Sequence, residues 1–165
     1  MANTYELIAS QLLTTTAASI TFSSIPSTYT DLKIVASVRS NGASEDYSSI
    51  SINGVTTGFT SIYVQGNGSS ASSGSLARWG GNYSAANNTA NTFGSAELYF
   101  PNYLSSTYKS YSVDNVTETN GTTAYAGLVA GLWSNTSAIS SITLTANGGS
   151  YVAYSNFYLY GIKNS

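Results

Sequence analysis

The sequence contains neither cysteine nor histidine among its 165 residues. Without cysteine the chain has no disulfide and no thiolate metal site. Without histidine it lacks the commonest general base and a common zinc ligand. A serine nucleophile would then need a lysine base, and Lys33, Lys109 and Lys163 lie in no recognisable motif. We therefore predict a protein that is not an enzyme and that holds no metal ion or cofactor.

Charge is also scarce, with five basic and seven acidic residues. This leaves no basic patch that could neutralise phosphates, so nucleic acid is not expected as a partner. No apolar run approaches the roughly 20 residues that cross a bilayer, so no membrane partner is expected either. The opening MANTYELIAS lacks a basic segment followed by an apolar one, which predicts synthesis in a cytoplasm without a secretion signal.

Glycoside hydrolysis is the catalytic reaction that these absences leave open, because it needs only two carboxylates about 5 to 10 Å apart. The candidate carboxylates are Glu97, Asp114 and Glu118. The alternative, which we favour, is that these groups are solvated ends of strands or partners of Lys109.

Small uncharged residues dominate what is present, since Ser, Thr, Asn and Gly make up 80 of the 165 residues. Such a bias can indicate disorder, but disordered chains are poor in aromatic residues. This chain has 14 Tyr, 5 Phe and 2 Trp. Aromatic and β-branched residues favour strands, while Gly, Asn and Ser favour turns. The composition therefore indicates an ordered all-β protein.

Alternation of apolar and polar residues recurs along the chain, as in DLKIVASVR and ISSITLTA. Each alternating run predicts a strand with one buried face, and we count nine to eleven of them. The pair Asn53-Gly54 follows ISI and predicts a type I′ turn, in which both residues take positive φ angles. The pattern predicts one β-sandwich domain over residues 1–165, jelly-roll-like in its connectivity. One segment, 66–91, is nearly all small and polar, and we expect a long loop there that faces a partner.

The aromatic residues suggest where contacts form. Trp133 follows an apolar run and is expected in the core, whereas Trp79 lies among polar residues and could contact a protein or a sugar. Tyrosines crowd the last 70 or so residues of the chain, from Tyr99 to Tyr160, and Tyr is enriched at protein interfaces. We predict subunit or capsid contacts at five residues: Trp79, Tyr83, Tyr103, Tyr158 and Tyr160.

The closing segment NFYLYGIKNS offers apolar or aromatic side chains to both faces of a strand. Alternation places Phe157 and Leu159 on one face and Tyr158, Tyr160 and Ile162 on the other. We favour the first pair as core, which leaves the second set to contact another subunit, and the reverse assignment stays open.

Three segments resemble small structural proteins of tailed phages, including phages of cyanobacteria and marine bacteria: TANTFGSAELYFPNY, KSYSVDNVTETNGTTAYAGLVAGLWSNTSAISSITL and FYLYGIKNS. The stretches TYELIAS and ASITFSSIPSTYTDLKIVASVRS resemble the same group, so the resemblance spans nearly the whole chain. It implies a β-sandwich or jelly roll that assembles, often as a trimer, on the outside of a virion. It implies no catalytic residues.

The hypothesis that we favour is a capsid decoration or cement protein, a homotrimer that binds the major capsid protein and stabilises the shell. It would be made in the host cytoplasm and reside on the capsid surface. The alternative is a receptor-binding module of a phage tail or head fibre that binds host glycans through Trp79 or the 66–91 segment. A bacterial carbohydrate-binding module is a third hypothesis, weakened by the missing secretion signal.

Overall fold

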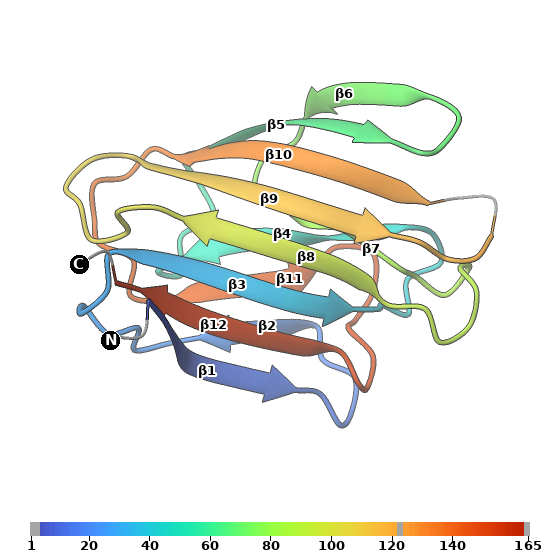
Figure 1. Ribbon diagram of the computed structural model, residues 1–165, viewed down its shortest axis with the longest axis horizontal. Coiled ribbons are helices and arrows are strands. Elements are labelled where there is room, and N and C mark those ends of the chain that lie inside the picture. The colour runs from blue at the N-terminus through green and yellow to red at the C-terminus, as the bar shows by residue number, and fades with distance from the viewer. Residues whose placement is uncertain (1–3, 122–123, 164–165) are drawn as a thin grey trace.

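The computed structural model describes residues 4–121 and 124–163, and its regular structure is entirely β-strand (Figure 1). Residues 1–3, at the start of the segment from which we predict no secretion signal, lie outside the described residues. The strands are β1 (Tyr5–Leu12), β2 (Ser19–Phe22), β3 (Asp31–Val38), β4 (Asp46–Ile52), β5 (Phe59–Gly66), β6 (Ala71–Ser75), β7 (Trp79–Tyr83), β8 (Gly94–Phe100), β9 (Lys109–Thr117), β10 (Tyr125–Trp133), β11 (Ile142–Ala146) and β12 (Asn156–Ile162).

The strands form two antiparallel sheets that pack face to face. The large sheet has the order β1-β12-β3-β8-β9-β10-β5-β6, and the small sheet has the order β2-β11-β4-β7. In Figure 1 the large sheet lies in front of the small one, and β1 and β12, near the two ends of the chain, lie side by side. The predicted all-β sandwich is therefore confirmed. A jelly roll has eight strands, whereas twelve strands divide eight to four here, so the jelly-roll expectation is not confirmed.

Alternation along the strands decides what enters the space between the sheets. In β9 every second residue is buried, from Lys109 to Thr117, and the residues between them are exposed. Trp133 is buried as predicted and stacks on Phe59, with ring centroids 6.0 Å apart. Phe157 and Leu159 are fully buried, as the favoured assignment of the last strand requires. Ile162 is also buried, so its expected place in a contact surface is wrong.

The turn at Asn53-Gly54 has the predicted geometry. The φ angles are 52° at Asn53 and 74° at Gly54, as a type I′ turn requires. Ile52 and Val55 exchange backbone hydrogen bonds across it. The Asn53 side chain also joins this turn to the segment before β11, because its Oδ1 accepts hydrogen bonds from the backbone N–H groups of Ser140 and Ser141.

The expected long loop over 66–91 is wrong, because the segment contains β6 and β7. Its small residues form β6 because β5 supplies a paired partner strand along its whole length. The stretch after β7 is held by the guanidinium of Arg39, which donates hydrogen bonds to the carbonyl oxygens of Asn88, Thr89 and Thr92. Polar composition thus indicated a loop where backbone pairing and one arginine build ordered structure.

Tyrosine rings lie over glycines at three places in the large sheet. Tyr111 covers Gly131 on the neighbouring strand, and Tyr63 covers Gly74 in the same way. The third pair is Tyr29 and Gly161. A glycine without a Cβ leaves a flat site on the sheet that an aromatic ring from a neighbouring strand can fill. Because tyrosine rings fill the space over these glycines, the sheet is packed there without larger aliphatic side chains.

We expect Gly131→Ala to destabilise the fold by about 1 to 3 kcal/mol, the usual cost of adding a methyl group to a packed core. A Cβ at this position would overlap the Tyr111 ring, which is itself stacked on Phe100 at 5.6 Å. Gly127→Ala on the same strand is the matched control, because its Cβ would come no closer than 3.2 Å to the Asn115 side chain. Urea unfolding measures both changes, and equal losses of stability would contradict this packing.

Alkaline pH should weaken the fold through Tyr111. Burial raises the pKa of this phenol to about 12, against about 10 in an unfolded chain. The stabilisation is fully present below about pH 10 and is lost as the pH rises through about 12, a fall of about 2 to 3 kcal/mol. Urea unfolding of the wild type and of Tyr111→Phe over this range isolates the effect, because both proteins contain Lys109, whose pKa burial lowers, and Tyr83 and Tyr151, whose pKa burial raises. The same fall in both proteins would show that Tyr111 is not the cause.

Candidate functional site: an apolar strip and a side pocket

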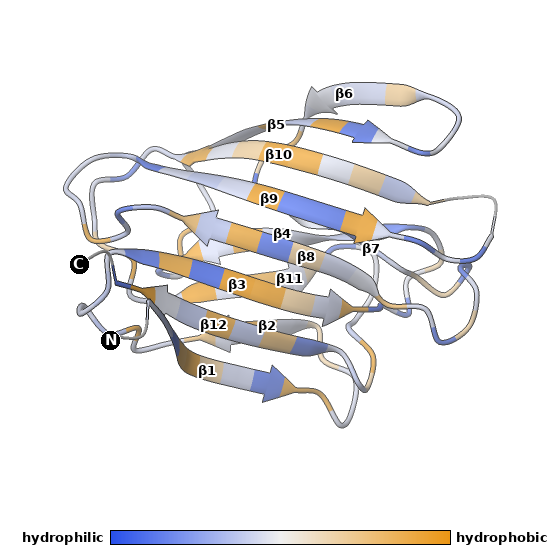
Figure 2. Cartoon of the chain, viewed as in Figure 1, coloured by the Kyte–Doolittle hydropathy of each residue, from blue (hydrophilic) through white to orange (hydrophobic). Residues whose placement is uncertain are grey.

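Four large apolar side chains lie exposed on three adjacent strands, β5, β9 and β10, on the outer face of the large sheet, away from the small sheet. They are Ile62, Val64, Val116 and Leu128, with exposed fractions of 64%, 58%, 44% and 57%. Figure 2 shows hydrophobic colouring on neighbouring parts of β5 and β10 and at the end of β9. We call these four residues the apolar strip.

Strand pairing makes the apolar strip continuous. Val64 lies directly opposite Leu128, and Ile62 lies opposite Ala130 on the same pair of strands. Val116 is next in this surface, opposite Ala126 on the other side of β10. Directly paired side chains in antiparallel strands have Cβ atoms about 4.5 to 5.5 Å apart and contact one another. The strip therefore crosses three adjacent strands.

The surface over the strip is hollowed. One hollow, with a volume of about 780 Å³, is bounded by Val64 and Leu128 and extends to Ala71 on β6. A second of about 520 Å³ shares Val64 and Leu128 and continues toward Ile62. Their shared lining residues join the two into one shallow depression along the strands.

A carboxylate stands beside this depression. Asp114 lies opposite Leu128 on one side and opposite Glu97 on the other. Glu97 forms an ion pair with Lys33, whose Nζ lies 2.6 Å from its Oε2. Within residues 4–121 and 124–163, Asp114 has no such ion pair. The apolar strip therefore carries one negative charge that no cation of the described chain neutralises.

The three carboxylates considered for hydrolysis have different surroundings. Glu97 and Asp114 lie side by side on adjacent strands, as expected, but Glu97 is held by Lys33. Glu118 accepts a hydrogen bond from the backbone N–H of Asn120 at 2.8 Å. Lys109, expected as their partner, is instead buried and donates to the backbone carbonyls of the preceding turn. Its inward position on β9 turns it away from the exposed carboxylates.

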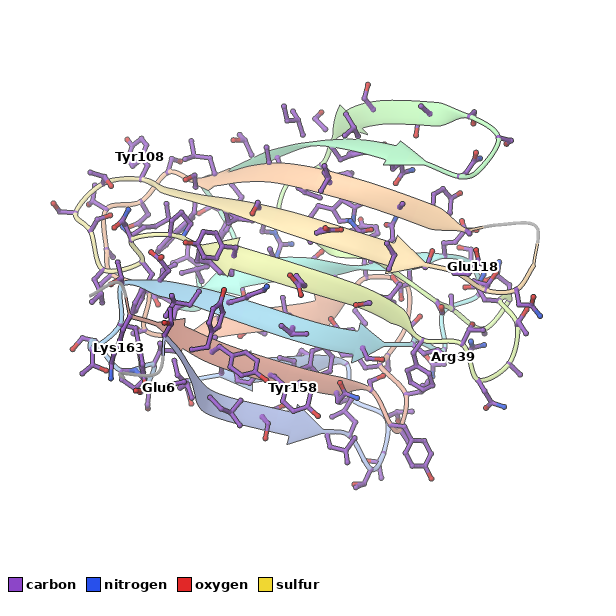
Figure 3. All side chains as sticks on the ribbon, in the orientation of Figure 1. Glu6, Arg39, Tyr108, Glu118, Tyr158 and Lys163 are labelled. Atoms are coloured by element: carbon purple, nitrogen blue, oxygen red, sulfur yellow. The ribbon has the colours of Figure 1, made fainter. Side chains whose placement is uncertain are left out.

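Two of the five predicted contact residues lie on the outer face of β12. Tyr158 is 36% exposed and is labelled in Figure 3, and Tyr160 is half-buried beside it with ring centroids 6.5 Å apart. The strands β3 and β8 separate β12 from the apolar strip. The outer face thus has the apolar strip at one end and, at the other, an aromatic end where the exposed Leu7 of β1 lies opposite Tyr160.

The other three predicted contact residues belong to the core. Trp79, Tyr83 and Tyr103 are each at most 3% exposed. The Tyr83 hydroxyl donates a hydrogen bond to the carbonyl of Tyr47 at 2.7 Å, and the Tyr103 hydroxyl donates to that of Pro26. Side chains buried within one chain cannot offer broad contact area, so these three predictions are wrong. Polar sequence neighbours suggested exposure of Trp79, but alternation along β7 turns Trp79 and Tyr83 inward. Tyr103 lies in the turn after β8, where its hydrogen bond to Pro26 holds it in the core.

Sequence reasoning missed the residues of the apolar strip. The sequence does indicate two-sided strands here, because FTSIYVQ and GLVAGLW carry apolar residues at both odd and even positions. The same two-faced pattern was recognised only in the last strand. In an alternating strand, apolar residues of both parities require cover on both faces.

A smaller pocket lies on the inner side of β5, opposite the apolar strip. Its volume is about 200 Å³. We call it the side pocket. It is lined by Glu45, Tyr47, Tyr63, Gln65, Leu76, Trp79, Asn82 and Tyr125.

Aromatic rings form much of the side pocket. The Tyr63 and Trp79 rings meet edge to face, with centroids 4.1 Å apart, and Tyr47 meets Trp79 in the same way at 6.3 Å. Burial of Tyr125, together with the neighbouring negative charge of Glu45, raises the pKa of its phenol. The rings of Tyr47, Tyr63 and Trp79 are thus fixed by packing against one another.

Amide groups complete the side pocket. The Asn82 side chain donates a hydrogen bond to Oε1 of Gln65 at 3.0 Å, and its backbone N–H donates to the Asn115 side chain at 3.1 Å. The indole N–H of Trp79 is buried, and no residue of the described chain accepts a hydrogen bond from it.

No family model matches the sequence, and no curated protein matches it significantly. Among the described residues, no group of three or more Asp and Glu is placed to hold a metal ion. The part of the chain that the structure describes has no helix long and apolar enough to cross a membrane.

Proposed function

We propose that the protein is a structural component of a phage virion, a capsid decoration or cement protein that binds the major capsid protein through the apolar strip. The observation that carries this proposal is the exposed, continuous set of Ile62, Val64, Val116 and Leu128 on one sheet face. Contiguous exposed apolar patches on monomers mark sites that another molecule covers. The resemblance to phage structural proteins suggests that this other molecule is the major capsid protein.

The energetics favour a protein partner. Complete burial of an aliphatic side chain is worth about 1.5 to 3 kcal/mol, and each strip residue retains about half of its surface for a partner to cover. Anything that binds only the assembled shell stabilises it against opening. A decoration protein bound through the strip would therefore raise the temperature at which capsids open.

Asp114 predicts the charge of the partner surface in the proposed interface. Its carboxylate lies beside Leu128 without an ion pair among the described residues, so apolar surface alone would leave it desolvated and unpaired. An isolated charge is costly to bury, whereas a charge paired with a cation is tolerated. We therefore expect the facing surface of the capsid protein to combine aliphatic side chains with one Lys or Arg opposite Asp114.

The proposed assembly is a homotrimer on the capsid surface, made in the host cytoplasm before it binds. We assign the contacts between copies to the aromatic end of the large sheet, where Tyr158 and Tyr160 lie exposed or half-exposed on β12. Tyrosine suits this position because its ring adds large contact area and its hydroxyl tolerates partial exposure to water.

Binding to capsids tests the strip directly. Leu128→Asp should weaken binding of this protein to purified capsids that lack it by tenfold or more, because the change buries a second charge beside Asp114. It should also remove the rise in capsid opening temperature that the wild type gives. Leu12→Asp is the matched control, because Leu12 is exposed to a similar degree, 64% against 57% for Leu128, but lies on β1 at the opposite edge of the sheet.

Circular dichroism of both variants checks that the fold is retained. An unchanged opening temperature with the wild-type protein would contradict the proposed decoration role. Equal binding by Leu128→Asp and Leu12→Asp would contradict the strip as the docking surface.

The solution mass tests the trimer. Light scattering over a dilution series should give about three times the 17.2 kDa of one chain. Tyr158→Ser should lower the concentration-dependent mass toward that of the monomer, because it removes a large exposed ring from the expected contact. Tyr154→Ser is the control, since Tyr154 is 76% exposed but lies outside β12. A wild type that stays monomeric at every concentration would refute the trimer.

A further inference from the structure

We propose that the side pocket binds one uncharged sugar ring, such as the terminal residue of a cell-surface glycan. This inference goes beyond the proposed capsid-binding role. Tyr63 and Gln65 point to the opposite side of β5 from Ile62 and Val64. The two sites can therefore be occupied at the same time and can be tested separately.

The walls of the side pocket suit the apolar faces of a sugar ring. Tyr47, Tyr63 and Tyr125 contribute half-buried rings, Leu76 adds an exposed aliphatic surface, and Trp79 lies buried against Tyr47 and Tyr63. Aromatic faces carry negative charge density, and the C–H groups of a sugar ring are polarised positively by the neighbouring oxygens. Ring faces and sugar C–H groups therefore attract one another while water is displaced from both.

The polar groups suit sugar hydroxyls. The hydrogen bond from Asn82 to Gln65 uses one donor of the first amide and one acceptor of the second. Each amide has two donors and an oxygen with two lone pairs, so both retain capacity for a ligand. Sugar hydroxyls each donate and accept, which matches a pair of amides that present both kinds of group.

The single carboxylate selects the charge of the ligand. Glu45 lines the side pocket beside the Tyr125 phenol, and the described lining includes no lysine or arginine. A carboxylate accepts strong hydrogen bonds from vicinal hydroxyls, yet it repels acidic sugars and phosphates. The ligand class is therefore a neutral sugar rather than a sialic acid, a uronic acid or a nucleotide.

Size limits the ligand to one ring. Pockets for drug-sized ligands have volumes of about 300 to 1,000 Å³, and the side pocket has about 200 Å³. A single six-membered ring enters such a space, while further residues of a glycan would remain outside. We therefore expect recognition of a chain end.

Proton–nitrogen correlation spectra test the proposal with a probe inside the pocket. The chain has two tryptophans, so two indole N–H signals are expected, and Trp133→Phe assigns them. The full-length protein is titrated with the methyl glycosides of glucose, galactose, mannose and N-acetylglucosamine. We expect at least one glycoside to shift the Trp79 signal in a saturable way and to leave that of Trp133, which stacks on Phe59, unchanged.

Two conservative variants then test the lining. Glu45→Gln and Tyr125→Phe should each weaken the affinity for that glycoside by about tenfold, since hydrogen bonds to charged groups are worth about 1.5 to 3 kcal/mol. Glu118→Gln is the matched control outside the pocket and should bind like the wild type. Leu128→Asp should also bind sugar normally, so the failure of one proposal does not entail failure of the other. No shift of the Trp79 signal with any of the four glycosides, or unchanged affinity in both lining variants, would overturn the sugar site.

Discussion

The structure depends on one constraint, which is that a strand sends alternate side chains to opposite faces and only one face of the large sheet is covered by the small sheet. The inward positions hold the rings that pack between the sheets, including Trp133, Phe157 and Tyr111. The outward positions of β5, β9 and β10 are largely exposed. The apolar strip is the consequence, because these three strands carry aliphatic residues at outward positions, on the face opposite the rings that they send inward.

The strand β5 connects the two candidate sites. Its outward residues Ile62 and Val64 belong to the apolar strip, while its inward residues Tyr63 and Gln65 line the side pocket. A protein attached to a larger surface by one face could thus present the other side to solvent, because the two sets of side chains point in opposite directions. The charges on the outer face agree with a partner at the strip. Lys33 is paired with Glu97, whereas Asp114, opposite Glu97, lies beside the strip.

Much of the fold could be predicted from the sequence, because alternation and turn chemistry are local signals. The positive φ angles at Asn53 and Gly54 and the burial of Phe157 and Leu159 follow from such signals. The candidate sites could not be predicted as well, because they depend on which strands become neighbours. Trp79 illustrates the difference: its polar neighbours in sequence suggested exposure, but the strand pairing of β7 with β4 places its ring under Tyr63 and Tyr47.

The central claim is that another virion protein covers the outer face of the large sheet at the apolar strip. An electron cryomicroscopy map of phage particles that carry this protein tests it most directly, because the twelve strands can be placed in the density without any assumption about contacts. The account predicts that β5, β9 and β10 lie against the major capsid protein, with a Lys or Arg of that protein facing Asp114. A map in which Ile62 and Leu128 face solvent, while other parts of the chain hold it to the shell, would contradict the account.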